Sequence, residues 1–503
     1  MHSDIIIVGA GIAGLATAIK TAESRPDLRI AILNKGSEDN SNSYYAQGGV
    51  AAVLDPENDS FDLHISDTLQ SGGYLNNPAT VEALVHGITG EIARLESWGA
   101  QFLKNGNRYV LGREGGHSAH RIVHAAVPTG KEIMRVLRSK AIQMPNIQWL
   151  RGLLVTELIQ EHHQCTGVKA LHHPLQQTFE LRAQAVVLAT GGSGQAFSQT
   201  TNSPQATGDG IALAHQAGAH IRHMRFVQFH PTALYEKGSG MRFLLSEALR
   251  GAGAHLLNHT GQRFMLHEHP DAELATRDVV SSAIYRQMST YGLDHVYLDL
   301  RPIPVTLLRE QFPYIVQTLL TKGYNPAVDP IPVSPAAHYQ CGGIATDLSA
   351  ATSIPGLFAI GECAENGLHG RNRLASNSLA EALVFSTYLA MKLSDLSPAR
   401  TYMSAVGQPI GTAPSPDYSD EVLRLKEHFR DILYKGFIAG DYYSTLQKCS
   451  ALHRELLSIK HLHPDCIQTL NLMHTGLLIL QDAVQYQQMQ KEFRPIPGIP
   501  LQS

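Results

Sequence analysis

The stretch from Asp4 to Lys20 constrains the fold of this chain more than any other. Its sequence is DIIIVGAGIAGLATAIK, in which an apolar β-branched run breaks into Gly9, Gly11 and Gly14 and resumes as an alanine-rich segment. Gly9 permits a tight turn, Gly11 lets the backbone approach a diphosphate, and Gly14 lets a helix lie close against its strand. This order of strand, turn and helix is the dinucleotide-binding fingerprint, and it predicts a Rossmann-like domain.

The composition is that of a globular protein with several domains. The chain has 503 residues, of which 43% are hydrophobic and 17% charged, and its formal net charge of -4 gives no basic surface for nucleic acid. Its five cysteines form no CxxC pair, which argues against a disulfide framework and indicates a reducing compartment. The first strand begins at Asp4 and no apolar run reaches the roughly 20 residues that span a bilayer. We therefore expect a cytoplasmic protein without signal peptide or transmembrane segment.

The segments after the fingerprint predict further strands of the same sheet. Residues 29–33 should form the second strand, and Asn34 and Lys35 stand where an acidic residue usually binds a ribose. An amide can bind a hydroxyl and a lysine suits a phosphate, so this departure weakens an NAD hypothesis more than dinucleotide binding itself. Buried strands are also expected at 183–188 and 356–360, after a β meander over 154–181. Their separation indicates one domain split by an insertion, in which a helix is predicted over 273–291.

Polar residues gather beside glycines and prolines, where loops meet rigid elements. Each histidine or arginine alone is more often structural, and the chain has 26 histidines. Their joint occurrence around a dinucleotide fold is what indicates a site. His120 and His124 have the spacing of a zinc helix, but Arg121 stands where HExxH has glutamate, so we predict no metal site. The polar stretches are 41–49 (SNSYYAQGG), 113–118 (REGGHS), 228–233 (QFHPTA), 246–251 (SEALRG), 275–278 (ATRD), 335–343 (PAAHYQCGG) and 368–378 (LHGRNRLASNS).

Several of these stretches carry a resemblance to a known family. They are HPTAL at His230, EALRG at Glu247, RD at Arg277, PAAHYxCGG at Pro335 and GExxxxGLHGxNRxASNSL from 361 to 379. They occur in family order between Asp4 and about residue 393. The chain therefore resembles the succinate dehydrogenase/fumarate reductase flavoprotein family, and within it the members that oxidise L-aspartate.

The resemblance implies an α/β fold: a Rossmann-like FAD-binding domain, residues 1–225 and 341–400, is split by an α+β capping domain, residues 226–340. A linker over 394–416 should lead to a C-terminal helical bundle, residues 417–492. In succinate-oxidising relatives a histidine before AQGG carries the flavin, whereas residues 43–46 contain none, so noncovalent FAD is expected. The implied FAD contacts are Gly9, Ala10, Gly11, Ile12, Ala13, Gly14, Lys35, Asn42, Ser43, Tyr44, Tyr45, Ala46, Gln47, Gly48, Gly49, Val155, Asp209, Glu362, Ser378 and Leu379.

The reaction implied by the resemblance is oxidation of L-aspartate to iminoaspartate, towards quinolinate and NAD, with fumarate as a second ligand and functional coupling to quinolinate synthase. By resemblance Arg373 and His338 hold one end of the substrate, and His230 and Ser246 hold the other. Arg277 corresponds to the family's catalytic arginine, the proton donor in fumarate reduction. Glu114 should face the substrate ammonium. Two departures are Ser246, where threonine is frequent, and residues 485–491, where a basic stretch is usual.

Two alternative functions share these residues. A soluble fumarate reductase or succinate-oxidising flavoprotein would use the same arginines and histidines, and Glu114 and the missing flavin-linking histidine argue against it. A non-catalytic flavin-binding subunit would keep the fold without the chemistry, yet every substrate-gripping position holds a competent side chain. The sequence leaves the physiological electron acceptor and the oligomeric state open.

Overall fold

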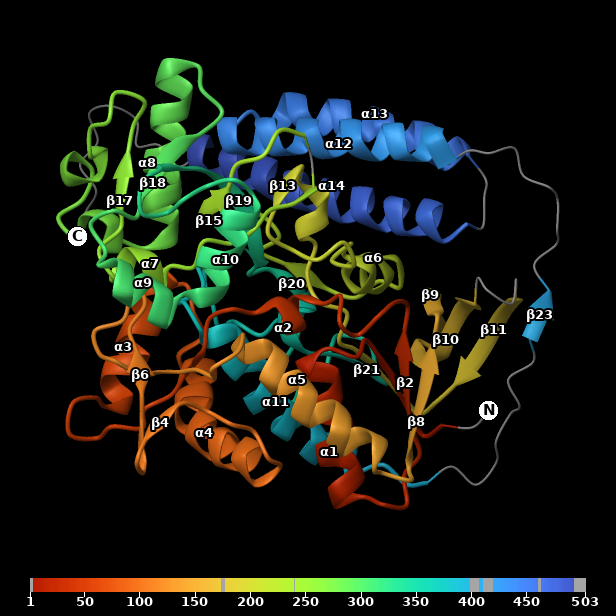
Figure 1. Ribbon diagram of the computed structural model, residues 1–503. Helices are drawn as coiled ribbons and strands as arrows, with labels where there is room; N and C mark the ends of the chain where they lie inside the picture. Colours follow the sequence, from red (N-terminus) through yellow and green to blue (C-terminus); the bar gives the residue numbers. More distant parts are fainter. Residues whose placement is uncertain are drawn as a thin grey trace, which may run out of the picture.

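The computed structural model describes residues 3–172, 177–238, 240–398, 407–409, 419–459 and 463–492. In Figure 1 the N-terminal part, in red and orange, lies below the green insertion and the blue C-terminal helices. The predicted linker falls mostly outside the described residues, and so does the tail after residue 492. None of the helices among the described residues is both long and apolar enough to cross a membrane.

A five-stranded parallel sheet is the centre of the first part. Its order is β21 (Leu357–Ala359), β12 (Ala185–Leu188), β1 (Ile5–Val8), β2 (Ile30–Asn34) and β8 (Ile147–Arg151). Every residue of β1 is buried, because helices and a second sheet cover both faces, as expected for a parallel sheet. Ile5 and Ile7 pack into one hydrophobic cluster, whereas Ile6 and Val8 pack into another. The α/β prediction is confirmed, including the pairing of strands more than 170 residues apart.

Four helices cover the face of the sheet that Ile5 and Ile7 reach. They are α1 (Ile12–Ser24), α4 (Pro78–Ser97), α5 (Thr129–Ile142) and α11 (Asn377–Leu393). α1 lies so close to β1 that a Cβ on Gly14 would meet the Gly9 carbonyl oxygen at 2.1 Å. Between them run α2 (Asn42–Tyr45), β3 (Val50–Ala51), α3 (Phe61–Ser71), β4 (Lys104–Asn105), β5 (Arg108–Tyr109), β6 (Leu111–Gly112) and β7 (Ile122–Val123).

The predicted meander packs on the opposite face as three antiparallel strands, β9 (Leu153–Glu161), β10 (Gln164–His172) and β11 (Gln177–Arg182). α6 (Asp209–Gln216) packs there too. Short strands complete this side: β14 (Ile221–Arg222), β20 (Gly343–Ala345) and β22 (Ala364–Glu365) form one sheet, and β23 (Gly407–Pro409) extends the meander.

The insertion is bounded by two long antiparallel strands, β15 (Val227–Leu234) and β19 (Ile331–Gln340). It has a hydrophobic cluster of its own, built from residues between Leu234 and Val333. β13 (Gln199–Thr200) pairs with β19, and this links the insertion to the nucleotide-binding part. Its other elements are β16 (Gly240–Met241), α7 (Ala248–Gly251), β17 (His255–Leu257), α8 (Arg277–Tyr291), β18 (Val296–Asp299), α9 (Val305–Gln311) and α10 (Pro313–Thr321).

The helix predicted over 273–291 begins four residues later than expected, at Arg277. Glu273 lies instead in a short 3-10 turn, Ala272–Leu274. Its carboxylate is drawn away from the helix axis, because it pairs with Arg263 at 2.6 Å and accepts a hydrogen bond from the Leu256 amide. Thr276 is extended, and the helix starts only after it.

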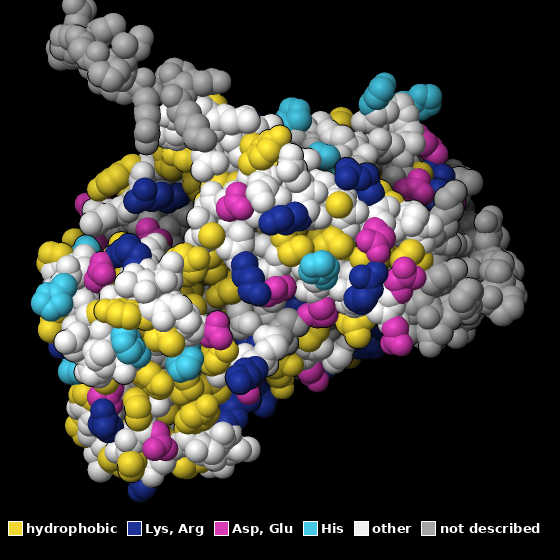
Figure 2. All heavy atoms as spheres, turned by 90° about the horizontal axis from the view of Figure 1, so that it is seen from above, with side chains coloured by type: hydrophobic (Ala, Val, Ile, Leu, Met, Phe, Trp, Pro, Cys, Tyr) yellow, Lys and Arg dark blue, Asp and Glu magenta, His cyan; other side chains and the backbone are white. Residues whose placement is uncertain are grey.

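Three C-terminal helices form the last region, α12 (Ser419–Ala439), α13 (Tyr442–Ser458) and α14 (Pro464–Glu492). Their apolar side chains share one cluster with the sheet and the meander, in which Phe429 and Phe197 are both fully buried. Arg430 donates hydrogen bonds to the Phe197 carbonyl and to Gln195. Seen from above, this region carries positive and negative side chains interspersed, with no field of a single sign on the face in view (Figure 2).

Candidate active site

A cavity of about 690 Å³ opens at the carboxyl ends of β1 and β2 and runs to the insertion. In open α/β sheets ligands bind at this edge, where the strand order reverses. Every residue that the sequence singled out for cofactor or substrate lines it, except Gly14. Gly14 packs α1 against β1 and has no place in the cavity wall.

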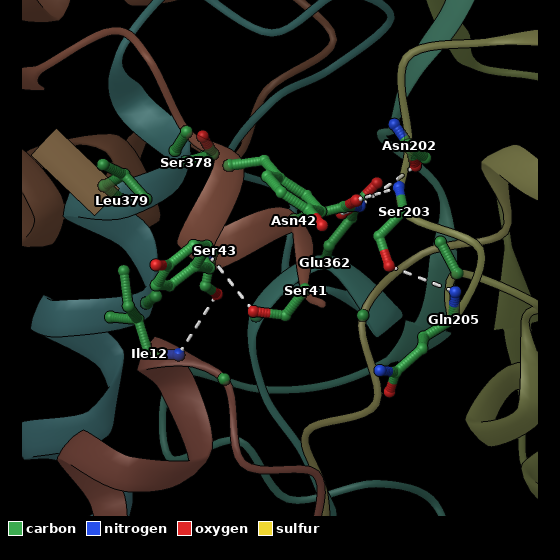
Figure 3. A pocket seen from close by; sticks show the side chains of 18 of the residues that line it. Ile12, Ser41, Asn42, Ser43, Asn202, Ser203, Gln205, Glu362, Ser378 and Leu379 are labelled. Carbon is green, nitrogen blue, oxygen red and sulfur yellow. Dashed lines mark hydrogen bonds between the residues drawn. The ribbon is translucent and has the colours of Figure 1, made fainter. Parts of the chain in front are cut away.

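The glycines at the start of α1 bring bare backbone to the cavity. Gly9 has φ +114°, and a Cβ there would meet the Ala189 carbonyl oxygen at 2.2 Å, so only glycine fits. The N-cap residue of α1, Gly11, has no side chain to cap the helix, and the Ile12 amide donates instead to Ser43 Oγ at 3.2 Å, as Figure 3 shows. Uncapped amides at a helix N-terminus attract anions. This end of the cavity therefore suits a diphosphate.

The predicted polar loop 41–49 forms the next part of the wall, with residues 42–45 wound into α2. Asn42 lies at its centre: its side chain accepts a hydrogen bond from the Ser203 amide at 2.8 Å and donates to Glu362 Oε2 at 3.4 Å (Figure 3). Burial raises the pKa of Glu362 to about 7. A Cβ on Gly49 would meet the Val123 carbonyl at 2.2 Å, so this glycine serves close packing.

Lys35, which follows β2, is hydrogen-bonded to three polar side chains of the protein. Its ammonium contacts Asp209 at 2.6 Å, Thr207 at 2.7 Å and Gln468 at 3.0 Å. A lysine has three N–H donors, and all three are used here. Asp209 also accepts a hydrogen bond from Asn471 of α14. This lysine thus belongs to a polar network with α14 and also lines the cavity.

At the other end of the cavity two buried arginines converge. Arg277 Nη1 and Arg373 Nη2 both donate to Gln228 Oε1, at 3.1 and 3.2 Å. Arg277 is also paired with Glu247 at 2.6 Å, and Glu247 contacts Arg250 at 3.0 Å. Burial alone would raise the pKa of Glu247, but the two guanidinium groups hold it below its ordinary value. Positive charge is therefore concentrated at this end.

The two histidines lie side by side beneath these arginines, with ring centroids 5.2 Å apart. His230 Nδ1 accepts a hydrogen bond from the Thr232 amide, so the neutral ring carries its proton on Nε2, which is buried without a partner. His338 Nδ1 lies 2.7 Å from Thr201 Oγ1. Burial and the charge of Arg277 lower the pKa of both rings well below its ordinary value. Both are therefore neutral before any anion arrives.

Glu114 and Ser246 complete the predicted set. Glu114 is buried, and Ser376 donates to its carboxylate at 2.5 Å. Burial, together with Glu247, raises the pKa of Glu114. Ser246 lines the cavity, and its hydroxyl accepts a hydrogen bond from the Ala248 amide at 3.4 Å.

Comparison with known proteins identifies the family. A family model described as an FAD binding domain matches residues 4–379. L-aspartate oxidase of Nostoc sp. is 47% identical over 402 residues, which are 79% of this chain and 68% of that protein. The L-aspartate oxidase of Pseudomonas aeruginosa is 37% identical over 96% of this chain and 93% of its own length. The chain belongs to the L-aspartate oxidase family. Its FAD-binding fold is that of the predicted flavoprotein family.

Solved structures of reductases share the fold of this chain. A mutated form of E. coli quinol fumarate reductase FrdA has a TM-score of 0.85 and 30% identity, over 96% of this chain and 88% of that one. Adenylylsulfate reductase from Archaeoglobus fulgidus has a TM-score of 0.70 at 16% identity, and this likeness concerns the fold alone.

The cavity fits the FAD of this family. Gly9 and Gly11 offer backbone without side chains, and α11, like α1, begins without a side-chain cap. Two helix N-termini whose N-cap residues make no side-chain cap thus border one elongated cavity. Val155, Ala189 and Leu379 add apolar wall. Among the described residues, no three His, Cys, Asp or Glu side chains are grouped as metal ligands.

Several lining or supporting residues were not selected from the sequence. Gln228 and Glu247 stand inside quoted motifs, and their pairing with Arg277 becomes visible only in three dimensions. Ser376 is buried, with φ +61°, where α11 begins. Asn202, Ser203 and Gln205 lie opposite α2 in Figure 3, in a stretch without any motif.

Proposed function

We propose that this protein binds FAD noncovalently and oxidises L-aspartate to iminoaspartate, with oxygen or fumarate taking the electrons afterwards. The observation that carries the proposal is the meeting of Arg277 and Arg373 on Gln228, beside the neutral His230 and the buried Glu114. Two carboxylates of a substrate can satisfy the cationic and donor groups, and the Glu114 carboxylate can face an ammonium. Bound FAD supplies an acceptor for the hydride that leaves the substrate Cα.

The side chains divide the work of holding the substrate. Arg373 and His338 grip one carboxylate, and His230, through Nε2–H, and Ser246 grip the other. Arg373 and His230 are buried, and the exclusion of water strengthens their contacts and fixes the direction of the Cα–H bond. Arg277 stabilises negative charge and takes no proton from aspartate. The aspartate ammonium passes one proton to the Glu114 carboxylate, whose pKa is raised by burial, and the hydride then leaves from the free amine. In fumarate reduction the same guanidinium donates a proton to carbon.

Three further assignments belong to this proposal. The FAD-binding domain is residues 1–225 and 341–400, the cap is 226–340, and the bundle is 417–492; the separate hydrophobic cluster of the insertion supports this division. The flavin has no covalent histidine partner, because residues 41–49 contain none. The protein acts in the cytoplasm and hands iminoaspartate to a quinolinate synthase, towards NAD.

An anaerobic titration tests the proposal. L-aspartate should bleach the flavin absorbance of the FAD-loaded protein, and oxygen or fumarate should restore it, with peroxide forming when oxygen is used. Rapid bleaching by succinate without any by aspartate would identify a succinate-oxidising flavoprotein instead. A yellow protein that neither substrate bleaches would be a flavin-binding subunit without this activity.

A further inference from the structure

Arg373 is a buried cation that lacks a carboxylate partner. Its side chain is 4% exposed, and the described residues offer it no ion pair. It donates to Ser378 Oγ at 3.0 Å and to Gln228 Oε1 at 3.2 Å, both of them neutral. Its Nε is buried without a partner. A buried charge is costly unless something compensates it, so the remaining neighbours of this guanidinium matter.

A further neighbour of the guanidinium is the ring of Tyr339. The Arg373 guanidinium carbon lies 4.5 Å from the ring centroid. Tyr339 follows His338 on β19 and lines the same cavity. The face of an aromatic ring attracts a cation most strongly where water is excluded, as it is here.

The hydroxyl of Tyr339 is itself anchored to a buried carboxylate. It donates to Glu381 Oε2 at 2.6 Å, and Glu381 is 1% exposed on α11. The same oxygen lies 3.1 Å from His369 Nε2, and Asn366 Nδ2 donates to Oε1 at 3.3 Å. A phenol that donates to a carboxylate gains electron density in its ring, and this strengthens the attraction for a cation above the face.

We propose that Tyr339 and Glu381 are positioning residues, which hold the Arg373 guanidinium as a preformed clamp for one carboxylate of a dicarboxylate. The inference rests on the proposed function, because it specifies how that site takes its substrate. Glu381 is linked to Arg373 by contact through the ring of Tyr339, while its charge also acts on Arg373 across space, and it does not line the cavity. The clamp is therefore set before a ligand binds, and the ligand does not have to order it.

The test measures fumarate affinity by isothermal titration calorimetry on the FAD-loaded protein. Tyr339→Leu removes the ring and should weaken binding about 30-fold. Tyr339→Phe keeps the ring, so it should recover most of that loss and stay within about tenfold of wild type. Glu381→Gln should cost about the same as Tyr339→Phe. Tyr434→Phe is the matched control, since it removes a partly buried hydroxyl that donates to the Pro335 carbonyl, and it should leave the fumarate affinity unchanged.

The double variant Tyr339→Phe with Glu381→Gln decides whether the two residues form one unit. Its fumarate affinity should be no weaker than that of Tyr339→Phe alone, because the relay is already broken. Additive losses, or wild-type affinity in both single variants, would overturn the proposal. The FAD affinity, from flavin fluorescence, should stay near wild type in Tyr339→Phe and Glu381→Gln, which a purely structural role would not predict. If Tyr339→Leu does not fold, the other variants still decide.

The outcome is separable from that of the proposed function. A wild-type protein that binds fumarate but leaves aspartate unoxidised refutes the oxidase assignment. The fumarate affinities of the variants still test the clamp in that case. A protein that oxidises aspartate with unchanged Michaelis constants in all three variants refutes the clamp alone.

Discussion

The two ends of the cavity differ in whether their charged and polar side chains have partners within the protein. At the end where β2 meets α14, Lys35 and Asp209 satisfy each other, with Thr207, Gln468 and Asn471 taking the remaining hydrogen bonds. At the insertion end, Arg373 and His230 keep buried nitrogen atoms without partners. The first end offers a ligand mainly backbone and shape, whereas the second offers unused donors and positive charge.

This difference shows what each end can select. A long dinucleotide gains affinity from many modest contacts, so the wall that holds it does not need free charge. A small dianion has few atoms, and it needs strong donors in a dry site to bind and to be oriented. Substitutions at the first end should therefore weaken FAD binding, whereas substitutions at the second end should slow the reaction with the substrate.

The largest effect is expected for Arg277→Leu. Loss of this donor leaves Glu247 with one guanidinium fewer and should slow flavin reduction by aspartate, and fumarate reduction, about 1,000-fold or more. FAD affinity should stay unchanged, because the change lies at the insertion end. Stopped-flow absorbance and flavin fluorescence measure the two quantities. Arg286→Leu on the same helix is the control, since Arg286 is exposed and pairs with Glu268. Retained activity in Arg277→Leu would refute the role of this residue.

Gly9→Ala should disrupt the end of the cavity where α1 begins. The added Cβ would meet the Ala189 carbonyl at 2.2 Å and sit at φ +114°, which pushes β1 away from β12. We expect the free energy of unfolding to fall by about 3 kcal/mol or more, with FAD affinity reduced at least about 100-fold. Urea unfolding and FAD titration measure both. Gly218→Ala separates strain from clash, because Gly218 has φ +87° with open space around it, and it should cost only about 1 kcal/mol.

Acid should lower the stability of the protein through two buried histidines beside the start of α11. Burial lowers the pKa of His64 to about 3 and of His117 to about 4; they contact Asn377 and the Ala375 carbonyl, where α11 begins. Below pH 6.5 the unfolded chain takes up protons that the folded chain refuses, so stability falls as pH falls. His64→Gln should flatten this fall by about 1.4 kcal/mol per pH unit, and exposed His120→Gln should not. Urea unfolding between pH 4 and 7 measures it, and equal slopes would contradict the assignment.

The smallest effect is expected for Lys35→Met. The change leaves Asp209 with the Thr207 and Asn471 hydrogen bonds, and it should cost about 1 to 3 kcal/mol of stability. FAD affinity should change less than about threefold, since the ammonium is already occupied. A loss of tenfold or more that grows at low salt would mean that this lysine binds a phosphate, and the comparison of the two ends would need revision.

Local patterns made much of the fold predictable. The strand, turn and helix over residues 4–24 follow from a continuous β-branched apolar run, three glycines and alanine-rich helix propensity. The later strand 357–359 repeats the pattern, so its place in the same sheet was foreseeable. The true start of α8 was not, because it depends on a distant partner that holds Glu273 in a turn.

The candidate site divides in the same way. Residues inside dense motifs, such as His230, Arg277 and Arg373, could be selected because residue type and order coincide with a family pattern. The three protein partners of Lys35 could not be predicted, because they come from segments distant in the sequence. Asn202 and Ser203 are common loop residues, and only their proximity to Asn42 marks them.

The strand order has a consequence for synthesis of the protein. β1 pairs with β12, and β12 with β21, so the sheet cannot close until residue 359 has left the ribosome. At typical elongation rates that delay lasts roughly 20 to 70 s after β1 is made. During this time an apolar strand with unpaired edges is exposed to other nascent chains. The yield of this protein when it is overproduced should therefore depend on chaperone capacity.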